Sequence, residues 1–379
     1  TADGSRSAEV PLEPALVRRI GQNPSADDKA TVNHAAGRPL TPGVFAGVTG
    51  IGIGEVSGAD ETMDGSLEMS DMRPEFDVTP AYNPHSSLVP IARIEGFTFT
   101  LLGAGTSTMI GGQGRMVSLD GGYDSFAGDP VMYVSLGGRA AGRTGESRAG
   151  QWMLMKQAMD EASNPTASNE PGLLTRTGRR VMSQFADGGT VVFSVDRASD
   201  ILQALRFADE FGFNAIISGG AEAWMVAEEL AGADVPVMLN PLQNLPSSFD
   251  ALGSRLDNAA LLNAAGVTVI INGAGSHNAR KQRQMAGNAV SYGLPFDAAL
   301  AALSSNPASV FGVDDQQGSI ERGKTANLVL WSGDPLEVTT VAEAVIVNGE
   351  LMPMESRQTK LRDRYLPENP EMPRAYIKP

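Results

Sequence analysis

The sequence predicts an α/β protein: a distorted TIM (β/α)8 barrel with a small β-sandwich domain formed by the N- and C-terminal segments. Strands and helices alternate between residues 190 and 303, four further strand-like runs precede them, and short β-rich runs follow residue 317. A barrel of this type closes with eight strands that alternate with helices. We therefore expect three parts: a composite sandwich of 1–40 and 318–352, a barrel of 41–317, and a Pro-rich tail of 353–379.

The second half of the predicted barrel has the clearest periodicity. Apolar, β-branched runs predict strands at 190–195, 214–218, 235–239 and 267–272. Helical spacing of apolar residues predicts a helix from an N-cap at Asp200 to Gly212. It also predicts helices over 222–232 and roughly 249–265, and one after the strand 267–272 that ends at about residue 292. Strands joined through helices are parallel, so we expect a parallel sheet here.

The first half is less regular. Its strand-like runs cover 44–50, 97–102, 116–119 and 131–136. The Gly- and Arg-rich stretch 137–150 follows the last of these runs, and we expect it to form a mobile loop at the mouth of the barrel.

Composition excludes several classes of protein. The chain has 379 residues with 44 acidic and 29 basic side chains, a net charge of −15, which argues against binding nucleic acid or an anionic membrane surface. With no cysteine, it has no disulfide, thiolate zinc site, iron–sulfur cluster or cysteine nucleophile. No run of about 18 apolar residues predicts a membrane span. Because the chain begins at Thr1, we expect an upstream segment to have been removed, which favours a periplasmic or secreted location over the cytoplasm.

The segment GSIERGKT (318–325) matches the phosphate-loop pattern letter for letter. That pattern needs a strand before it and a helix N-terminus after it, since the phosphates lie on the helix N-terminus. Here ANLVLW follows, which reads as a strand. We therefore predict a turn between strands with no affinity for nucleotide.

Four segments carry a resemblance to a known family. NPASVFGVDDQQGSIERGKTANLVLWSGDPLEVTTVAEAVIVNGELM (306–352) resembles the closing segment of amidohydrolase-superfamily proteins. RASDILQALRFADEFGFNAIISGGAEAW (197–224), NPHSSLVPIARIEGFT (83–98) and IGGQG (110–114) resemble the imidazolonepropionase-like branch of that superfamily. The resemblance covers most of 37–352. It implies a barrel that uses zinc or a similar divalent metal to hydrolyse a C–N bond in a cyclic amide or a peptide.

The resemblance also implies metal ligands at the strand ends, and this chain lacks them. The family's positions fall on Val48 and Gly50 after the first strand, Ser194 after the fifth, Gly219 after the sixth and Gly275 after the last. None of these side chains is an imidazole, thiolate or carboxylate, the groups that bind zinc. We therefore expect no metal cofactor.

Other polar residues remain as site candidates. The chain has three histidines, His34, His85 and His277. The candidate catalytic residues are Asp196, His277 and Glu222. Each also has an ordinary structural interpretation: Asp196 as a solvated carboxylate, His277 as a loop residue that caps a helix, and Glu222 as an acidic residue in the first turn of a helix. The candidate pocket residues are Gln113, Ser194, Glu55 and Asp60.

Two functions follow from this reading. The first is an amidohydrolase-like protein that lacks the usual metal ligands and serves as a non-catalytic binding or assembly subunit. The alternative is a hydrolase acting on C–N bonds with a rebuilt site. The tail carries apolar residues that a free tail would leave in water, so we expect a homo-oligomer or a hetero-oligomer with an amidohydrolase paralogue. These tail residues are Leu361, Tyr365, Leu366, Met372, Tyr376 and Ile377.

Overall fold

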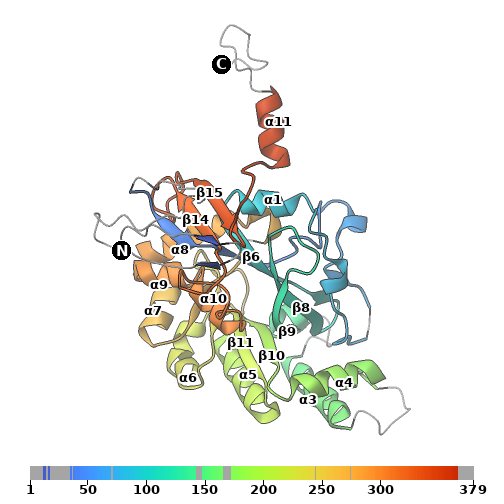
Figure 1. Ribbon diagram of the computed structural model, residues 1–379. Coiled ribbons are helices and arrows are strands. Elements are labelled where there is room, and N and C mark those ends of the chain that lie inside the picture. Colours follow the sequence, from blue (N-terminus) through green and yellow to red (C-terminus); the bar gives the residue numbers. More distant parts are fainter. Residues whose placement is uncertain are drawn as a thin grey trace, which may run out of the picture.

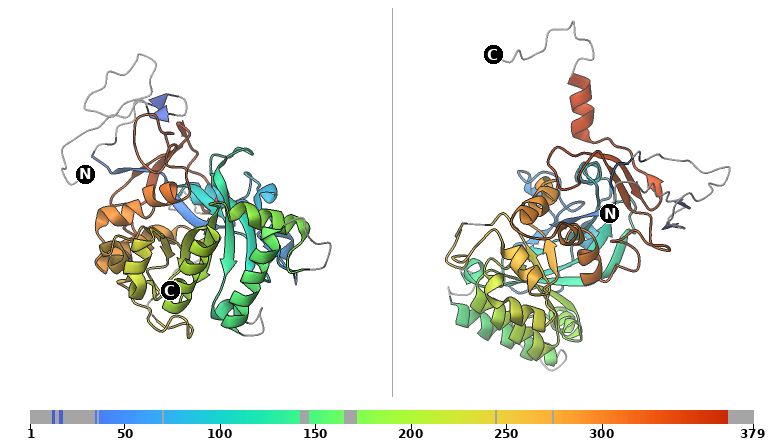
Figure 2. Two further views of the ribbon diagram at one scale, coloured as in Figure 1. Left: turned by 90° about the horizontal axis from the view of Figure 1, so that it is seen from below. Right: turned by 90° about the vertical axis from the view of Figure 1, so that its left-hand side faces the viewer.

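A computed structural model describes residues 12–13, 16–17, 35, 37–69, 71–141, 147–164, 172–243, 245–273 and 275–365. Its centre is an eight-stranded sheet rolled into a nearly closed barrel, so the predicted fold class is confirmed (Figures 1 and 2). The strands, in sheet order, are β13 (Val269–Ile271), β12 (Val237–Leu239), β11 (Asn214–Gly219), β10 (Thr190–Val195), β9 (Phe126–Ser135), β8 (Ile110–Ser118), β6 (Phe97–Leu102) and β4 (Val44–Thr49).

The barrel departs from an all-parallel sheet at one strand. β9 to β13 pair in parallel, as predicted for 190–272, and β4 pairs in parallel with β6. β8, however, runs antiparallel to both β6 and β9. The connections 103–109 and 119–125 are too short for a parallel crossover, which needs about a dozen residues. β8 also begins at Ile110, before the predicted start at residue 116, because the glycines in this part of the strand do not indicate β-structure in the sequence.

Helices cover the outside of the sheet. They are α1 (Leu88–Arg93), α2 (Gly138–Ala141), α3 (Arg148–Ser163), α4 (Arg176–Phe185), α5 (Ala198–Phe211), η3 (Ala223–Val226), α6 (Ala227–Gly232), α7 (Asn258–Ala264), α8 (Lys281–Ser291), α9 (Phe296–Ala301) and α10 (Ser305–Val310). The stretch expected to form a loop over 137–150 thus contains α2 and the start of α3, and its residues 142–146 lie outside the described part of the chain.

Two helix predictions are wrong. The N-cap of α5 is Arg197 rather than Asp200, because the buried Asp200 carboxylate pairs with Arg148 instead of a helix amide. The helix predicted over 249–265 forms only from Asn258 onward. Tertiary hydrogen bonds hold the residues before it in an irregular loop, since Gly253 donates to Glu222 and accepts from the Trp224 indole.

The barrel interior changes character along its axis. Its amino-terminal half is apolar, with Phe45 packed against Phe99 and Phe311 at centroid distances of 5.4 and 6.2 Å. Alternate residues of each strand point inward, so Val192 and Ile216 are followed on the same face by Ser194 and Ser218. The interior therefore turns from hydrocarbon to hydroxyl at the carboxyl ends of the strands.

A small sheet lies beside the barrel and joins both ends of the chain. Its order is β16 (Glu350–Leu351), β15 (Ala342–Val347), β14 (Leu328–Trp331) and β3 (Leu40–Pro42), all antiparallel. The GSIERGKT segment is irregular with a turn at residues 322–323 and leads into β14, as predicted. The Gly323 amide donates to the Val17 carbonyl within the short pair β1 (Leu12–Glu13) and β2 (Leu16–Val17). The predicted domain boundaries remain predictions.

The C-terminal tail forms a nine-residue helix, α11 (Arg357–Tyr365), that projects away from the body (Figure 1 and the right-hand view of Figure 2). None of its residues is buried. Residues 366–379, with four of the six apolar tail residues, lie outside the described chain. No helix in the described ranges combines the length and the apolar character that crossing a bilayer requires.

Candidate functional site

A cavity of about 390 Å³ opens at the carboxyl ends of the barrel strands. It is lined by Val48, Ala104, Gly105, Thr106, Thr108, Gly111, Tyr133, Val134, Ser135, Val192, Ser194, Ser218 and Asn272. In barrels of this type the carboxyl-terminal face is where ligands bind. The lining has polar hydroxyl and amide groups and no acidic or basic side chain.

Three serines form a row along one wall of the cavity. Ser135, Ser194 and Ser218 lie in register on the adjacent parallel strands β9, β10 and β11. Neighbouring strands are about 4.8 Å apart, so the three hydroxyls follow one another at roughly that spacing. All three side chains are half-buried, and none hydrogen-bonds to another residue in the described chain. The row thus offers donors and acceptors to a guest molecule.

Other residues of the cavity lining are held in place by their own hydrogen bonds. The Thr106 and Thr108 hydroxyls lie 2.9 Å apart, and the Thr106 hydroxyl donates to the Ile110 carbonyl at 2.7 Å. The Tyr133 hydroxyl donates to the Leu102 carbonyl at 2.7 Å. Burial raises the pKa of Tyr133 well above its ordinary value, so the phenol stays neutral.

Asn272 forms part of the cavity wall and also closes the barrel. β4 and β13 are the two ends of the sheet order, and no backbone ladder joins them. Instead, the Val48 amide donates to Asn272 Oδ1 at 3.0 Å, and the Gly50 amide donates to Ser276 Oγ at 2.7 Å. These side-chain contacts form the seam between β4 and β13. A Cβ on Gly47 would lie 2.7 Å from Asn272 Oδ1, so the seam also requires a glycine there.

The residues at this cavity do not fit a zinc ion. Val48 and Ser194, two of the positions expected to bind metal in the family, line the cavity with a hydrocarbon and a hydroxyl. A Cβ on Gly219 would lie 2.6 Å from Asp196 Oδ1, so this position excludes a longer side chain; Gly50 and Gly275 carry none either. Across the ranges that the structure describes, no three His, Asp or Glu side chains are grouped to hold a metal.

The structure places Asp196 and Glu222 near each other but outside the cavity lining. Both side chains are buried, and both accept backbone hydrogen bonds. Asp196 Oδ1 accepts from the Ala221 amide at 3.4 Å. The Glu222 carboxylate accepts from Ala198 at 3.1 Å and from Gly253 at 3.0 Å. Glu222 thereby ties the start of α5 to the loop before α7.

The other candidates lie in separate parts of the structure. His277 is exposed in η4 (Ser276–Asn278), and Asp60 is exposed at the start of η1 (Asp60–Thr62). The Gln113 amide donates to the Pro74 carbonyl at 2.7 Å. Burial raises the pKa of Glu55, but hydrogen bonds from the Ser87 hydroxyl and amide outweigh it and lower the pKa overall. Ser194 is the pocket candidate that the cavity includes.

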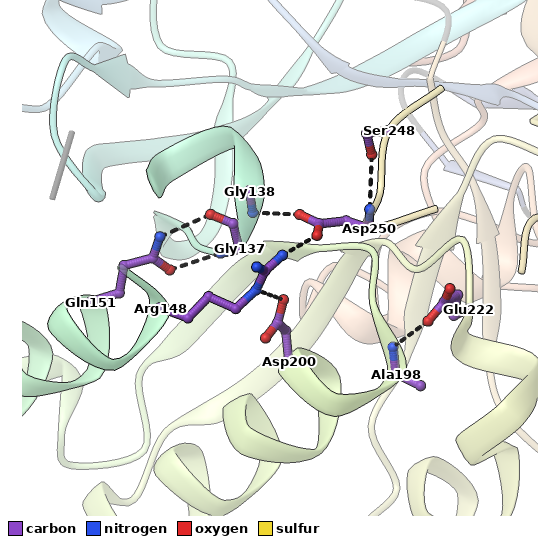
Figure 3. A network of polar contacts seen from close by, with 9 residues as sticks. All are labelled: Gly137, Gly138, Arg148, Gln151, Ala198, Asp200, Glu222, Ser248 and Asp250. Atoms are coloured by element: carbon purple, nitrogen blue, oxygen red, sulfur yellow. Dashed lines mark hydrogen bonds and ion pairs between the residues drawn. The ribbon is translucent and has the colours of Figure 1, made fainter. Parts of the chain in front are cut away.

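A charged network joins three loops at the carboxyl edge of the barrel (Figure 3). Arg148, at the start of α3, donates to Asp200 at 3.0 Å and also pairs with Asp250. The hydrogen bond to Asp200 is the main factor that raises the pKa of Arg148. The Gly138 amide donates to the second Asp250 oxygen, and a Cβ there would lie 2.4 Å from it. The network fixes the segments after β9 and β12 against the first turn of α5.

Sequence reasoning missed Ser135, Ser218 and Asn272. Each is the polar residue that ends an apolar strand run, in VMYVS, NAIIS and VTVIIN. In parallel strands such residues meet at one edge of the sheet, and that signal could have found all three.

The barrel is similar to those of amidohydrolases. Residues 174–352 match the model of the Amidohydrolase family. The chain is similar to the crystal structure of an amidohydrolase from Thermotoga maritima MSB8, with 26% identity and a TM-score of 0.81 over 91% of this chain and 94% of that one. It also has the fold of a prolidase complexed with N-methylphosphonate-L-proline, at 12% identity and a TM-score of 0.56 over 92% and 95% of the two chains.

A curated relative matches over a much shorter stretch. It is Amidohydrolase tasK from Hapsidospora irregularis, which is 40% identical over 58 residues. These residues are 15% of this chain and 6% of that protein. This chain therefore matches only a small part of that protein's length.

Proposed function

We propose that this chain is a non-catalytic binding subunit built on an amidohydrolase barrel, and that its cavity takes an uncharged polar small molecule. The row of Ser135, Ser194 and Ser218, together with Asn272 in the same cavity lining, supports this proposal. Hydroxyl and amide groups both donate and accept hydrogen bonds, so they match a guest that does the same. A charged guest would have no counter-charge in this lining and would lose its hydration without compensation.

The chemistry of the lining argues against metal-assisted hydrolysis. Metal-bound water in such enzymes has a pKa of about 7, compared with about 15.7 for bulk water. The cavity residues give a metal no carboxylate or imidazole to bind. General-base help from a side chain contributes only about 10²–10⁴-fold, which is small beside ordinary enzyme accelerations of about 10⁶-fold or more.

The second candidate is a C–N bond hydrolase with a site rebuilt from Asp196, Glu222 and His277. The match of residues 174–352 to the Amidohydrolase family favours it. Against it, Asp196 and Glu222 accept backbone hydrogen bonds and His277 is exposed, so the three do not converge on the cavity.

Two measurements test the choice between these functions. Protein prepared without chelators should contain far less than one transition-metal ion per chain, and it should not hydrolyse dipeptides, N-acyl amino acids, hydantoins or imidazolones above background. Turnover of about 1 per second that is lost in Asp196→Asn or His277→Ala would establish the rebuilt hydrolase instead.

Ligand binding is tested separately by thermal shift. Neutral polyols, sugars and amides should raise the melting temperature, and charged compounds of similar size should not. Ser194→Val combined with Ser218→Val should weaken binding at least about tenfold, since each lost hydrogen bond contributes about 1 kcal/mol. The exposed Ser291→Val variant is the matched control. Equal binding by all these proteins would refute the cavity as the site.

Three further assignments belong to this proposal. The motifs at 83–98, 110–114 and 197–224 favour the imidazolonepropionase-like branch with a degenerate metal site. The projecting C-terminal helix favours assembly with a second copy or with an amidohydrolase paralogue. A periplasmic or secreted location is the third assignment, and localisation of a tagged full-length gene product tests it.

A further inference from the structure

Helix α11 starts from a fixed base and ends in solvent. Ser356 is buried, and its hydroxyl accepts from the Thr359 amide while the Thr359 hydroxyl accepts from the Ser356 amide. This reciprocal pair caps the first turn and fixes where the helix begins. Beyond it, Arg357–Tyr365 buries no residue against the body (Figure 1). A nine-residue helix is only marginally stable alone in water, so a surface that covers α11 would stabilise it.

One face of α11 is both basic and apolar. Leu361 and Tyr365 are four residues apart and so lie on the same face, and Tyr365 is 74% exposed. Lys360 and Arg364 share the adjacent stripe. Across the whole helix four basic side chains stand against one acidic, a net charge of +3 on a chain with a net charge of −15. Lys360 also pairs with Glu355 at 3.2 Å, whereas Arg364 makes no ion pair within the described residues.

The loop 56–69, which contains η1 and the two-residue strand β5 (Ser66–Leu67), has the complementary surface. It contains Asp60, Glu61, Asp64 and Glu68 and no basic residue. All four carboxylates are exposed, and none pairs with a basic side chain in the part of the chain described. Apolar side chains are exposed among them: Val56 at 54%, with Met63 and Met69. Methionine is flexible and polarisable, and it adapts to partner surfaces, aromatic rings included.

We propose that α11 of one protomer docks on the acidic loop 56–69 of a second copy of this chain. Leu361 and Tyr365 pack against Met63 and Met69, while Lys360 and Arg364 meet the loop carboxylates. The inference deepens the assembly role proposed above and is independent of the cavity ligand. In a two-fold dimer the same contact occurs twice, since each protomer gives a helix and receives one.

Charge complementarity selects a second copy over the other occupants. An acidic chain repels its own kind unless basic surface meets acidic surface, and α11 is the projecting basic element. Exposed charges attract within a Debye length of about 8 Å at 0.15 M salt, which shrinks to about 3 Å at 1 M. The assembly should therefore dissociate as salt rises.

A charge-swap experiment on the full chain tests the contact. In sedimentation velocity at 1–50 µM protein, about the range of moderate protein affinities, the native chain should dimerise, and 1 M NaCl should weaken the dimer at least about tenfold. Lys360→Glu/Arg364→Glu should abolish the dimer, as should Asp64→Lys/Glu68→Lys. An equimolar mixture of these two variants should form heterodimers. In the heterodimer one native basic helix meets a native acidic loop, and one acidic variant helix meets a basic variant loop, so both contacts carry complementary charge. Glu228→Lys/Glu229→Lys makes the same charge change on α6, at exposed acids away from the loop, and should leave the dimer intact.

The absence of cysteine gives a second readout of the same contact. Leu361→Cys and Met63→Cys, each in a separate chain, should form a disulfide when mixed, and Leu361→Cys with the exposed Met153→Cys on α3 should not. A native chain that stays monomeric throughout this range refutes the inference. So does a dimer that survives the loop reversal, or α11-dependent binding to anionic vesicles by a monomeric chain. Unchanged ligand binding by the monomeric variants would show that the cavity function stands whether or not this contact does.

Discussion

The side-chain seam between β4 and β13 predicts a specific local defect. Asn272→Leu removes the acceptor of the Val48 amide, which is part-buried and has no ladder partner on that side. A buried amide left without an acceptor costs about 1–3 kcal/mol. Since about 1.4 kcal/mol corresponds to a factor of ten, the opening equilibrium of the seam should rise about 5- to 150-fold.

Hydrogen exchange with mass spectrometry measures this opening directly. Peptides that cover 44–50 should exchange faster by about this factor in Asn272→Leu, whereas peptides from β10 and β11 should keep their native rates. Ser276→Ala removes the acceptor of the Gly50 amide and should give a smaller increase at the same strand.

Asn214→Leu is the matched control. Its side chain also hydrogen-bonds the backbone, here by donating to the Gly188 carbonyl, but it is exposed and lies at the amino-terminal end of β11. This substitution should leave the exchange of 44–50 unchanged. Equal exchange of that strand in Asn272→Leu and the native chain would refute the role of Asn272 in closing the barrel.

Three further predictions concern other parts of the chain. Arg148→Met should lower the free energy of unfolding in urea by about 2 kcal/mol, because Asp200 and Asp250 lose their shared partner. This value lies between the loss of about 0–1 kcal/mol for an exposed ion pair and that of about 3–5 kcal/mol for a buried one. A loss below about 0.5 kcal/mol would contradict the role of the network. Glu161 has a pKa below its ordinary value of 4.5, since amide hydrogen bonds from Leu173 and Leu174 outweigh the opposing effect of burial. Its contribution to stability is therefore complete above about pH 4.5 and is lost as the pH falls through the lowered pKa, so Glu161→Gln should flatten the pH dependence of stability below about pH 4.5. ATP should not change the melting temperature of the native chain or of Lys324→Ala, because the Lys324 amine donates to Ser319 within a turn that no helix follows; a shift in the native chain alone would contradict the turn assignment.

Local sequence signals predicted the elements whose structure is set locally. The strands at 97–102 and 190–195 have the predicted bounds, because each is an apolar run that ends where the composition changes. The predicted α5 ends at Phe211 with Gly212 in the left-handed conformation, φ 75°, which glycine adopts without strain.

The errors lie where distant residues decide. Asp200 reads as an N-cap until Arg148, 52 positions away, is placed beside it. The segment 249–257 has helical spacing, but Glu222 and Arg148 hold Gly253 and Asp250 in a loop. Neither contact leaves a signal within a window of neighbouring residues.

The candidate site was predictable only in part. Ser194 and Val48 were placed from the sequence, and both line the cavity. The row of three serines depends on the register between β9, β10 and β11, which no single strand specifies. Asn272 and Val48 are 224 residues apart in the sequence, so their contact appears only once the sheet is rolled and its two end strands meet.

The seam also determines how long β4 stays without its partner while the chain is being synthesised. The acceptor for the Val48 amide is 224 residues further along the chain. At about 5–20 residues per second, a ribosome needs about 10–45 s to make those residues. Throughout that interval the outer edge of β4 has no partner of its own, and an open strand edge is a template for pairing with other chains. Slow elongation between residues 48 and 272 should therefore lower the yield of folded protein more than an equal pause after residue 276.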